Sequence, residues 1–74
     1  MNKIIITAIG IDRPGLVNKI TSIINQNYGN IENSKMIKID DQFAIILEFS
    51  TIENINGIKE SLKAIDDLEI YYKP

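Results

Sequence analysis

The first eleven residues alternate in the manner of a β-strand, but apolar side chains occupy both faces. One face carries Ile5, Thr7, Ile9 and Ile11, and the other carries Ile4, Ile6, Ala8 and Gly10. Strands that are apolar on both faces usually lie in the middle of a sheet and are covered twice. The pattern therefore predicts a central strand over residues 3–11.

After this strand the apolar period changes from two residues to between three and four. The positions concerned are Leu16, Val17, Ile20, Ile23, Ile24 and Tyr28. This spacing forms one stripe of an amphipathic helix. Asp12 is the natural N-cap of that helix, and Pro14 fits its first turn, where a missing N–H is harmless. Gly29 fits the left-handed position that ends many helices.

Two further strands follow, separated by a short polar connection. Residues 31–39 mix apolar positions with Glu32, Asn33, Lys35 and Lys38. Residues 43–49 place Phe43, Ile45, Leu47 and Phe49 on one face. Because only Asp40, Asp41 and Gln42 separate the two runs, we expect a β-hairpin.

A second helix and a last strand complete the pattern. Ser50 and Glu53 have the spacing of a capping box. The helical stripe that follows consists of Ile55, Ile58, Leu62 and Ile65. Gly57 lies within it at a cost of about 1 kcal/mol relative to Ala, so the pattern does not fix where the helix begins. Asp66 and Asp67 predict a turn, and a short strand carries Leu68, Ile70 and Tyr72.

The order β-α-β-β-α-β predicts a ferredoxin-like α+β sandwich over residues 1–74, as a single domain. Right-handed crossovers give a four-stranded antiparallel sheet with both helices on one face and the first and third strands in the middle. The open face then carries Ala44, Ile46 and half of the first strand. An apolar patch of this kind, or an edge strand, needs a cover. We therefore expect a homodimer, and the pattern leaves a tetramer open.

Composition excludes several classes of function. The chain has 74 residues, a net charge of −2, and neither Cys nor His. Disulfides, zinc or haem sites and nucleophilic triads are therefore not expected, and we predict no metal or cofactor. The basic residues are scattered, so we expect no nucleic-acid partner. No apolar run approaches the roughly 20 residues of a membrane span, so we expect a cytoplasmic protein without a membrane segment.

The loop from Asp12 to Leu16 is the best candidate for a binding site. A helix N-terminus presents unpaired N–H groups and the positive end of the helix dipole to an anion, and a neighbouring carboxylate can hold an ammonium group. A free α-amino acid carries both charges. Alternatively, Asp12 only caps the helix and Asn30 is only a turn residue. Arg13 is either a solvated charge or a second grip on an anionic group.

An enzyme is the weaker alternative. The adjacent pairs Asp40-Asp41 and Asp66-Asp67 fall in predicted turns, where neighbouring side chains point apart. Tyr71 is the other candidate for proton transfer, and it would need a deep pocket with converging ionisable groups. The same fold serves metal chaperones, acylphosphatases and RNA-binding modules. A Cys pair for metal, and a basic surface with aromatics on the central strands for RNA, are missing.

Two motifs carry a family resemblance. The run from Ile6 to Val17, with Gly-Ile-Asp-Arg-Pro-Gly at residues 10–15, and the run from Gly29 to Ser34 resemble an ACT domain. Within that superfamily they are similar to the glycine cleavage system transcriptional repressor family and related small ACT proteins. Gly10 departs from the pattern, because some serine-binding relatives have a ligand-contacting His there. The start at Met1 is typical of a freestanding protein.

The resemblance implies a regulatory domain that binds amino acids between two subunits, which pair side by side into an eight-stranded sheet. Asp12 matches the polar ligand contact of the loop, and Gly15 and Leu16 match the backbone donors. Asn30 matches the residue that reaches across from the partner. The expected site residues are Asp12, Arg13, Pro14, Gly15, Leu16, Asn30 and Ile31. We expect regulation of a partner protein, with a ligand-free protein-interaction module as the alternative.

Overall fold

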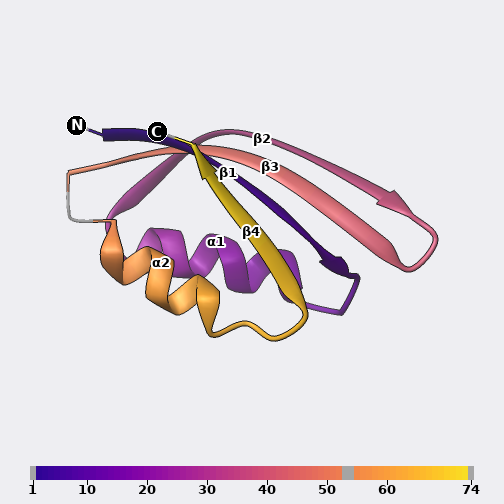
Figure 1. Ribbon diagram of the computed structural model, residues 1–74. Coiled ribbons are helices and arrows are strands. Elements are labelled where there is room, and N and C mark those ends of the chain that lie inside the picture. Colours follow the sequence, from indigo (N-terminus) through magenta and orange to yellow (C-terminus); the bar gives the residue numbers. More distant parts are fainter. Residues whose placement is uncertain (1, 53–54, 74) are drawn as a thin grey trace.

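The strands and helices follow the predicted order. The computed structural model describes residues 2–52 and 55–73. Its elements are β1 (Asn2–Ile11), α1 (Leu16–Gln26), β2 (Gly29–Ile39), β3 (Gln42–Thr51), α2 (Asn56–Lys63) and β4 (Leu68–Lys73). All strand pairs are antiparallel, in the order β2-β3-β1-β4. Both helices lie on one face of this sheet, as Figure 1 shows. The ferredoxin-like prediction is therefore confirmed.

β1 occupies the centre of the sheet, as its pattern predicts. It pairs with β3 from Asn2 opposite Thr51 to Ile11 opposite Gln42, and with β4 on its other side. Its even-numbered side chains from Ile4 to Gly10 are buried. The odd-numbered side chains, including Ile9 with 38% of its surface exposed, lie on the open face. Within the described chain, β1 is thus covered on one face and not on both.

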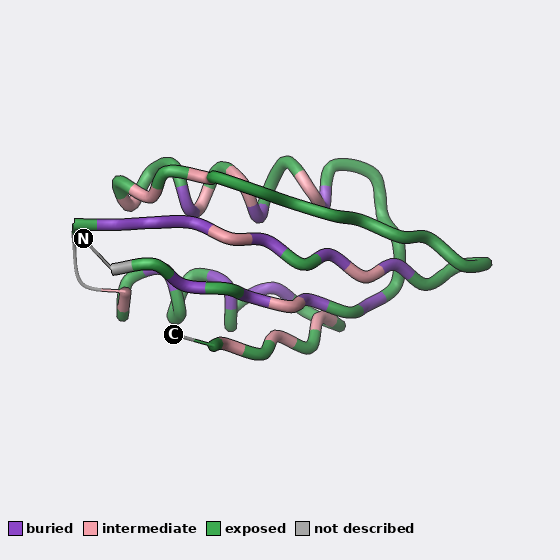
Figure 2. The backbone as a smooth tube through the Cα atoms, turned by 90° about the horizontal axis from the view of Figure 1, so that it is seen from above, coloured by how far each residue is buried: buried purple, intermediate pink, exposed green. Residues whose placement is uncertain are grey.

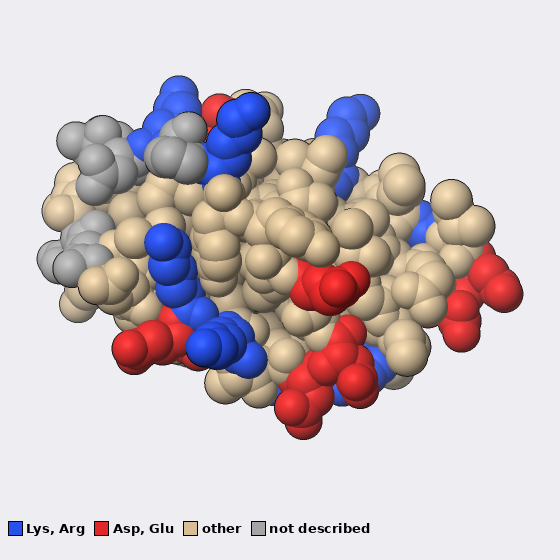
Figure 3. Space-filling model, in the orientation of Figure 1, with Lys and Arg blue, Asp and Glu red and all other residues tan. Residues whose placement is uncertain are grey.

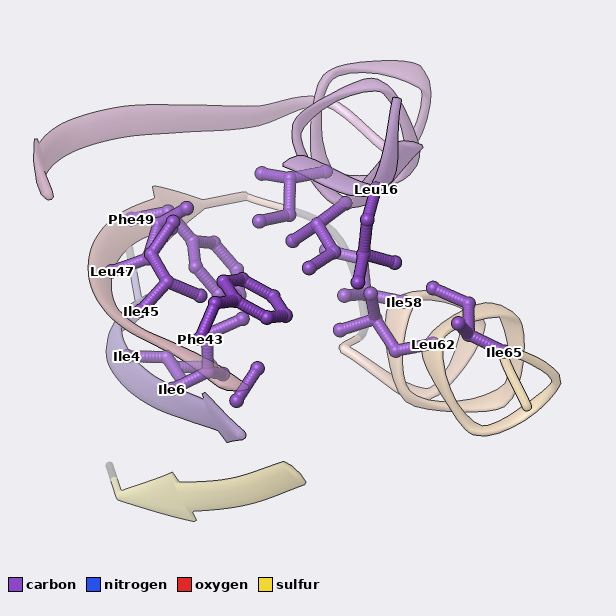
Figure 4. Packing of buried hydrophobic residues seen from close by; sticks show 13 residues of the cluster. Ile4, Ile6, Leu16, Phe43, Ile45, Leu47, Phe49, Ile58, Leu62 and Ile65 are labelled. Atoms are coloured by element: carbon purple, nitrogen blue, oxygen red, sulfur yellow. The ribbon is translucent and has the colours of Figure 1, made fainter. Parts of the chain in front are cut away.

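The core lies between the sheet and the helices. β3 contributes Phe43, Ile45, Leu47 and Phe49, and β1 contributes Ile4, Ile6 and Ala8. The helices contribute Leu16, Ile20 and Ile24 from α1 and Ile58 and Leu62 from α2, and Ile65 follows α2. Figure 4 shows the labelled side chains of the strands and helices directed toward one another. Each fully buried side chain of this size contributes about 1.5–3 kcal/mol relative to exposure.

α1 begins later than Asp12 predicts, so the N-cap assignment is wrong. The cap residue is Gly15, with a φ of 78°, and it forms no side-chain cap. Asp12 instead continues the extended backbone of β1, because its N–H donates to the carbonyl oxygen of Asp41 at 2.8 Å. The chain then turns through residues 13–15, where the Leu16 N–H donates to the Arg13 carbonyl at 3.2 Å.

The C-terminus of α1 also differs from the prediction. Tyr28, with a φ of 63°, takes the left-handed position, and Gly29 is the first residue of β2. A Cβ atom at Gly29 would lie 2.5 Å from Cγ2 of Ile24 and 2.9 Å from its carbonyl oxygen. Glycine is therefore required here because α1 and β2 approach closely, and not because of a left-handed conformation.

The capping-box prediction for α2 is wrong at Ser50. Ser50 is a buried residue of β3, opposite Lys3 on β1. α2 begins at Asn56 after Ile55, which forms no side-chain cap. Glu53, the other half of the predicted box, lies outside the described residues.

β2 is the most exposed strand of the sheet. It extends with β3 as a hairpin beyond the helices (Figure 1), and most of its length is exposed in Figure 2. Met36, Ile37 and Ile39 all keep more than half of their surface in contact with solvent. In the described part of the chain, β2 pairs only with β3, so its outer edge is open.

Candidate functional site

The predicted ligand loop lines a hollow at the end of β1. This hollow, which we call the loop hollow, has a volume of about 360 Å³ and lies between the loop, the start of α1 and β2. Its lining consists of Asp12, Arg13, Pro14, Gly15, Leu16, Val17, Asn18, Met36 and Lys38. The structure therefore brings five of the seven predicted site residues together, in a volume within the usual range for small-ligand sites.

Gly15 leaves space for a ligand at the start of α1. Its φ of 78° is a left-handed conformation that L-residues rarely adopt. A Cβ atom built there would have no neighbour within 4 Å. The first hydrogen bond of the helix runs from the Lys19 N–H to the Gly15 carbonyl at 2.9 Å. Among the described residues, the N–H groups of Val17 and Asn18 form no hydrogen bond and remain available to an anion.

Of the two donors that the family resemblance implies, the Gly15 N–H also forms no hydrogen bond among the described residues. The resemblance points to Gly15 and Leu16, but the Leu16 N–H is already directed at the Arg13 carbonyl. An Asp12 cap predicts an earlier helix start and therefore does not identify the Val17 and Asn18 N–H groups as free donors. Placing the start of α1 after Gly15 would have identified them.

Asp12 is held by a residue that the sequence did not single out. Lys38 of β2 places its Nζ 2.6 Å from Oδ2 of Asp12, with both side chains partly exposed. The register of the β2–β3 hairpin could have predicted that Lys38 lies near Asp12. Ile11 and Ile39 both lie opposite Gln42, one on each side of β3, so Asp12 and Lys38 lie near the same end of the sheet.

Arg13 connects the loop to another part of the molecule. Its Nη2 donates to the carbonyl oxygen of Asp66 at 2.7 Å, in the connection between α2 and β4. With Lys19 it also lines a second hollow of about 240 Å³ on that side. Arg13 is therefore neither freely solvated nor directed at Asp12, and it fixes the loop against the turn into β4.

Gly10 lies where the turn between α2 and β4 approaches β1. A Cβ atom at Gly10 would lie 2.5 Å from the carbonyl oxygen of Asp67. A histidine at this position, as in some serine-binding relatives, would force the turn to move. The absence of a side chain at residue 10 thus has a packing reason in this chain.

Asn30 and Ile31 lie at the other end of β2. They pair with Ser50 and Phe49, whereas the loop follows the pair Ile11 and Gln42. Ser50 and Gln42 are eight positions apart along β3, which corresponds to about 27 Å. One copy of the chain therefore does not join these two residues to the loop hollow.

A polar cluster around the Glu32 carboxylate lies at the Asn30 end of β2. Lys3 Nζ lies 3.3 Å from Oε1 of Glu32, which occupies an irregularity in the β2–β3 register. The Ser50 side chain, followed by Lys3, lowers the pKa of the Glu32 carboxyl from its ordinary value of 4.5. Within residues 2–52 and 55–73, no three acidic side chains come together as metal ligands, and no helix is long and apolar enough to cross a membrane.

The strand order and the two helices on one face define a ferredoxin-like domain. The sequence profile of the ACT domain matches residues 2–68. The chain belongs to the ACT domain family. The predicted membership is thus confirmed.

Relatives of known sequence point in the same direction. The glycine cleavage system transcriptional repressor of Escherichia coli is 34% identical over 67 residues, covering 90% of this chain and 35% of the repressor. The chain thus spans about a third of that relative's length. A UPF0237 protein of Methanopyrus kandleri is 31% identical over 74 residues, covering 95% of this chain and 82% of that protein. The chain is an ACT-domain protein related to this repressor.

Solved structures share the fold at low identity. Formyltetrahydrofolate deformylase from Burkholderia mallei aligns with a TM-score of 0.89 and 9% identity, covering 99% of this chain and 28% of the enzyme. The ACT domain from GTP pyrophosphokinase of Chlorobium tepidum aligns with a TM-score of 0.76 and 20% identity, covering 96% of both chains. These similarities concern the fold alone.

Proposed function

We propose that this chain is a regulatory ACT domain that binds a small α-amino acid in the loop hollow. A second copy completes the site, and the liganded pair modulates a partner protein. The observation that carries the proposal is that one hollow contains both groups that suit an anion and a group that suits a cation. The Val17 and Asn18 N–H groups suit a carboxylate, and the Asp12 carboxylate suits an ammonium group.

The open edge of β2 supports a site shared by two copies. Asn30 and Lys38 both lie four residues from Ser34. An antiparallel pairing of two β2 edges centred on Ser34 would therefore bring the partner's Asn30 to the level of Lys38, which contacts Asp12. The same pairing would cover the unpaired edge, which is a hazard in a lone sheet. Asn30 and Ile31 would then join the site from across the interface.

Regulation would follow from linkage. A ligand that contacts both copies binds the pair more tightly than the single chain, so it shifts the population toward the liganded pair. A partner that recognises one of these states would respond to the amino-acid concentration. No chemical step by this chain is required.

The Asp12–Lys38 ion pair is relevant to the alternative function, a protein-interaction module that binds no amino acid. Lys38 places its ammonium where the proposal puts that of the ligand. The ligand must displace it, or the hollow binds no amino acid and the domain serves as a protein-interaction module. Because the pair is partly exposed and such pairs contribute about 0–1 kcal/mol, displacement is energetically accessible.

Calorimetry with the twenty amino acids tests the proposal. Glycine is tried first because the bacterial relative is named for glycine cleavage. We expect saturable binding of at least one amino acid, and loss of that binding in Asp12→Asn and in Asn30→Ala. Mixing these two variants should restore part of the binding, because a mixed pair contains one intact site. Absence of heat with all twenty, from a folded pair, would favour the interaction module.

A further inference from the structure

A groove runs between α2 and the outer edge of β4. It has a volume of about 390 Å³ and is lined by Leu68, Ile70 and Tyr72 of β4 and by Lys59 and Lys63 of α2. The three β4 side chains pack against the core but are only partly buried, so they remain accessible. β4 lies at the opposite end of the sheet from β2, so this groove is distinct from the loop hollow.

The two charged side chains that line the groove are both basic. Lys59 Nζ lies 5.1 Å from the centroid of the Tyr72 ring, above one end of the groove. Neither Lys59 nor Lys63 forms an ion pair with any described residue. Glu60 and Glu69 belong to the same two elements but do not line the groove.

Two further acidic residues lie beyond one end of this groove. Asp66 and Asp67 occupy the connection that leads into β4, beyond the lining residues. In Figure 3, basic side chains lie over α2 with an acidic side chain beside them, and further acidic side chains lie toward this connection. The groove therefore favours negative charge alongside α2.

The backbone of β4 is open on the same side. β4 pairs with β1, and no other described strand lies along its outer edge. Alternate residues of a strand direct their N–H and C=O groups to opposite sides, so about half of these groups in β4 are available to a new strand. Main-chain pairing at such an edge is a general mode of peptide recognition.

The spacing of the two lysines matches an extended chain. Residues four apart on a helix are separated by about 6 Å along the axis. Side chains on the same face of a strand, two residues apart, are separated by about 6.6–6.8 Å. Two carboxylates at alternate positions of an added strand would therefore each meet one lysine.

We propose that the α2–β4 groove docks an extended, acidic segment of a partner protein. The segment adds to β4 as a fifth strand. Acidic side chains at alternate positions pair with Lys59 and Lys63, and a neighbouring apolar side chain on the same face packs on Leu68 and Ile70. This surface is independent of the amino-acid site proposed above.

Amide NMR of the uniformly ¹⁵N-labelled full chain tests the proposal. The probe is the capped peptide Val-Thr-Glu-Thr-Glu-Thr-Val, and the control peptide has Gln in place of both Glu residues. We expect shift changes concentrated in residues 57–73, with weaker binding of the Gln peptide. Lys59→Gln and Lys63→Gln should each weaken binding by about two- to fivefold, whereas Lys19→Gln on α1 should leave it unchanged.

N-methylated peptides test strand addition separately. Of two peptides methylated at opposite sets of alternate residues, one blocks the N–H groups that pair with β4 and should not bind, whereas the other should bind. No shift changes at millimolar peptide, changes centred on other elements, or equal binding of the Glu and Gln peptides would overturn the proposal. Equal binding of both methylated peptides would overturn the fifth strand.

Discussion

Lys38 Nζ lies 2.6 Å from Oδ2 of Asp12, so β2 is tied to the loop that follows β1. The pair joins the two sides of the loop hollow. It also gives Asp12 a cation when no ligand is bound. Ligand affinity should therefore depend on how readily Lys38 withdraws.

Replacing Lys38 should show whether this side chain mainly stabilises the fold or mainly competes with a ligand for Asp12. In Lys38→Gln, Asp12 loses its intramolecular cation, so an amino acid that binds the wild-type chain should bind more tightly, by up to about fivefold. The free energy of unfolding should change by less than about 1 kcal/mol, because both partners are partly exposed. Calorimetry and urea titration measure the two quantities. Lys63→Gln, on α2 and outside both the loop hollow and the proposed β2 contact, is the control, and equal affinity in the two variants would contradict the competition.

Gly15→Ala should destabilise the chain by about 1–2 kcal/mol. The φ of 78° puts an L-residue in the left-handed region, whereas the space around the new Cβ is open. The cost is therefore conformational and not steric. Gly15→Asn should cost less, since Asn tolerates this region better, and urea denaturation of the two variants measures the difference. Equal losses in Ala and Asn would show that backbone conformation is not the cause.

Gly29→Ala and Gly57→Ala should have opposite outcomes. A Cβ at Gly29 would meet Ile24 at 2.5 Å, so we expect a loss of about 1–3 kcal/mol from overpacking. A Cβ at Gly57 would meet only the end of the Asn27 side chain, at 3.0 Å. Replacing this helical glycine should leave stability unchanged or raise it by up to about 1 kcal/mol. Thermal unfolding distinguishes the two, and a stable Gly29→Ala variant would argue against the close packing of α1 on β2.

Acid should weaken the fold partly through Glu32. Its lowered pKa means that the folded state favours the carboxylate, so this contribution is present above the ordinary value of 4.5 and is lost as pH falls through the lowered pKa. Glu32→Gln should therefore lose less stability than the wild type on acidification below that value. Ser50→Ala should reproduce much of the effect, because the Ser50 side chain is the main cause of the shift. Urea titrations over this pH range provide the measurement, and parallel pH profiles of wild type and Glu32→Gln would contradict it.

Charge on the outer strand should impair pairing of two copies. Ile37 of β2 has 61% of its surface exposed, next to the proposed edge contact. Ile37→Lys should raise the dissociation constant of the pair, because lysine on an edge strand opposes strand addition. Ile52→Lys is the control, since Ile52 is 77% exposed and lies outside the strands. Sedimentation analysis measures both, and equal effects would point to a different interface.

Most of the architecture could be predicted because each element buries a regular stripe. The doubly apolar pattern of β1 placed it in the centre, and the stripes of α1 and α2 identified the residues that fill the core. The ends of the elements could not be predicted from local pattern. Ser50 has the chemistry of a cap but is paired within β3, and Tyr28 takes a left-handed conformation that its side chain would not suggest. Tertiary contacts decide these positions.

The candidate site was only partly predictable for a similar reason. The residues from Asp12 to Leu16 are adjacent in sequence, so a local motif identified them. Lys38 reaches Asp12 only through the register of the hairpin, and Val17 and Asn18 become donors only because the helix begins after Gly15. Asn30 is distant from the loop within one copy, so the role proposed for it requires a second chain.

The hydrogen bond from Arg13 to the Asp66 carbonyl connects the loop after β1 with the turn between α2 and β4. In the described structure, an exposed guanidinium therefore joins the loop that carries Asp12 to the turn that leads into β4. When one of these segments moves and the other stays in place, the movement is opposed by the small free energy of a single exposed hydrogen bond.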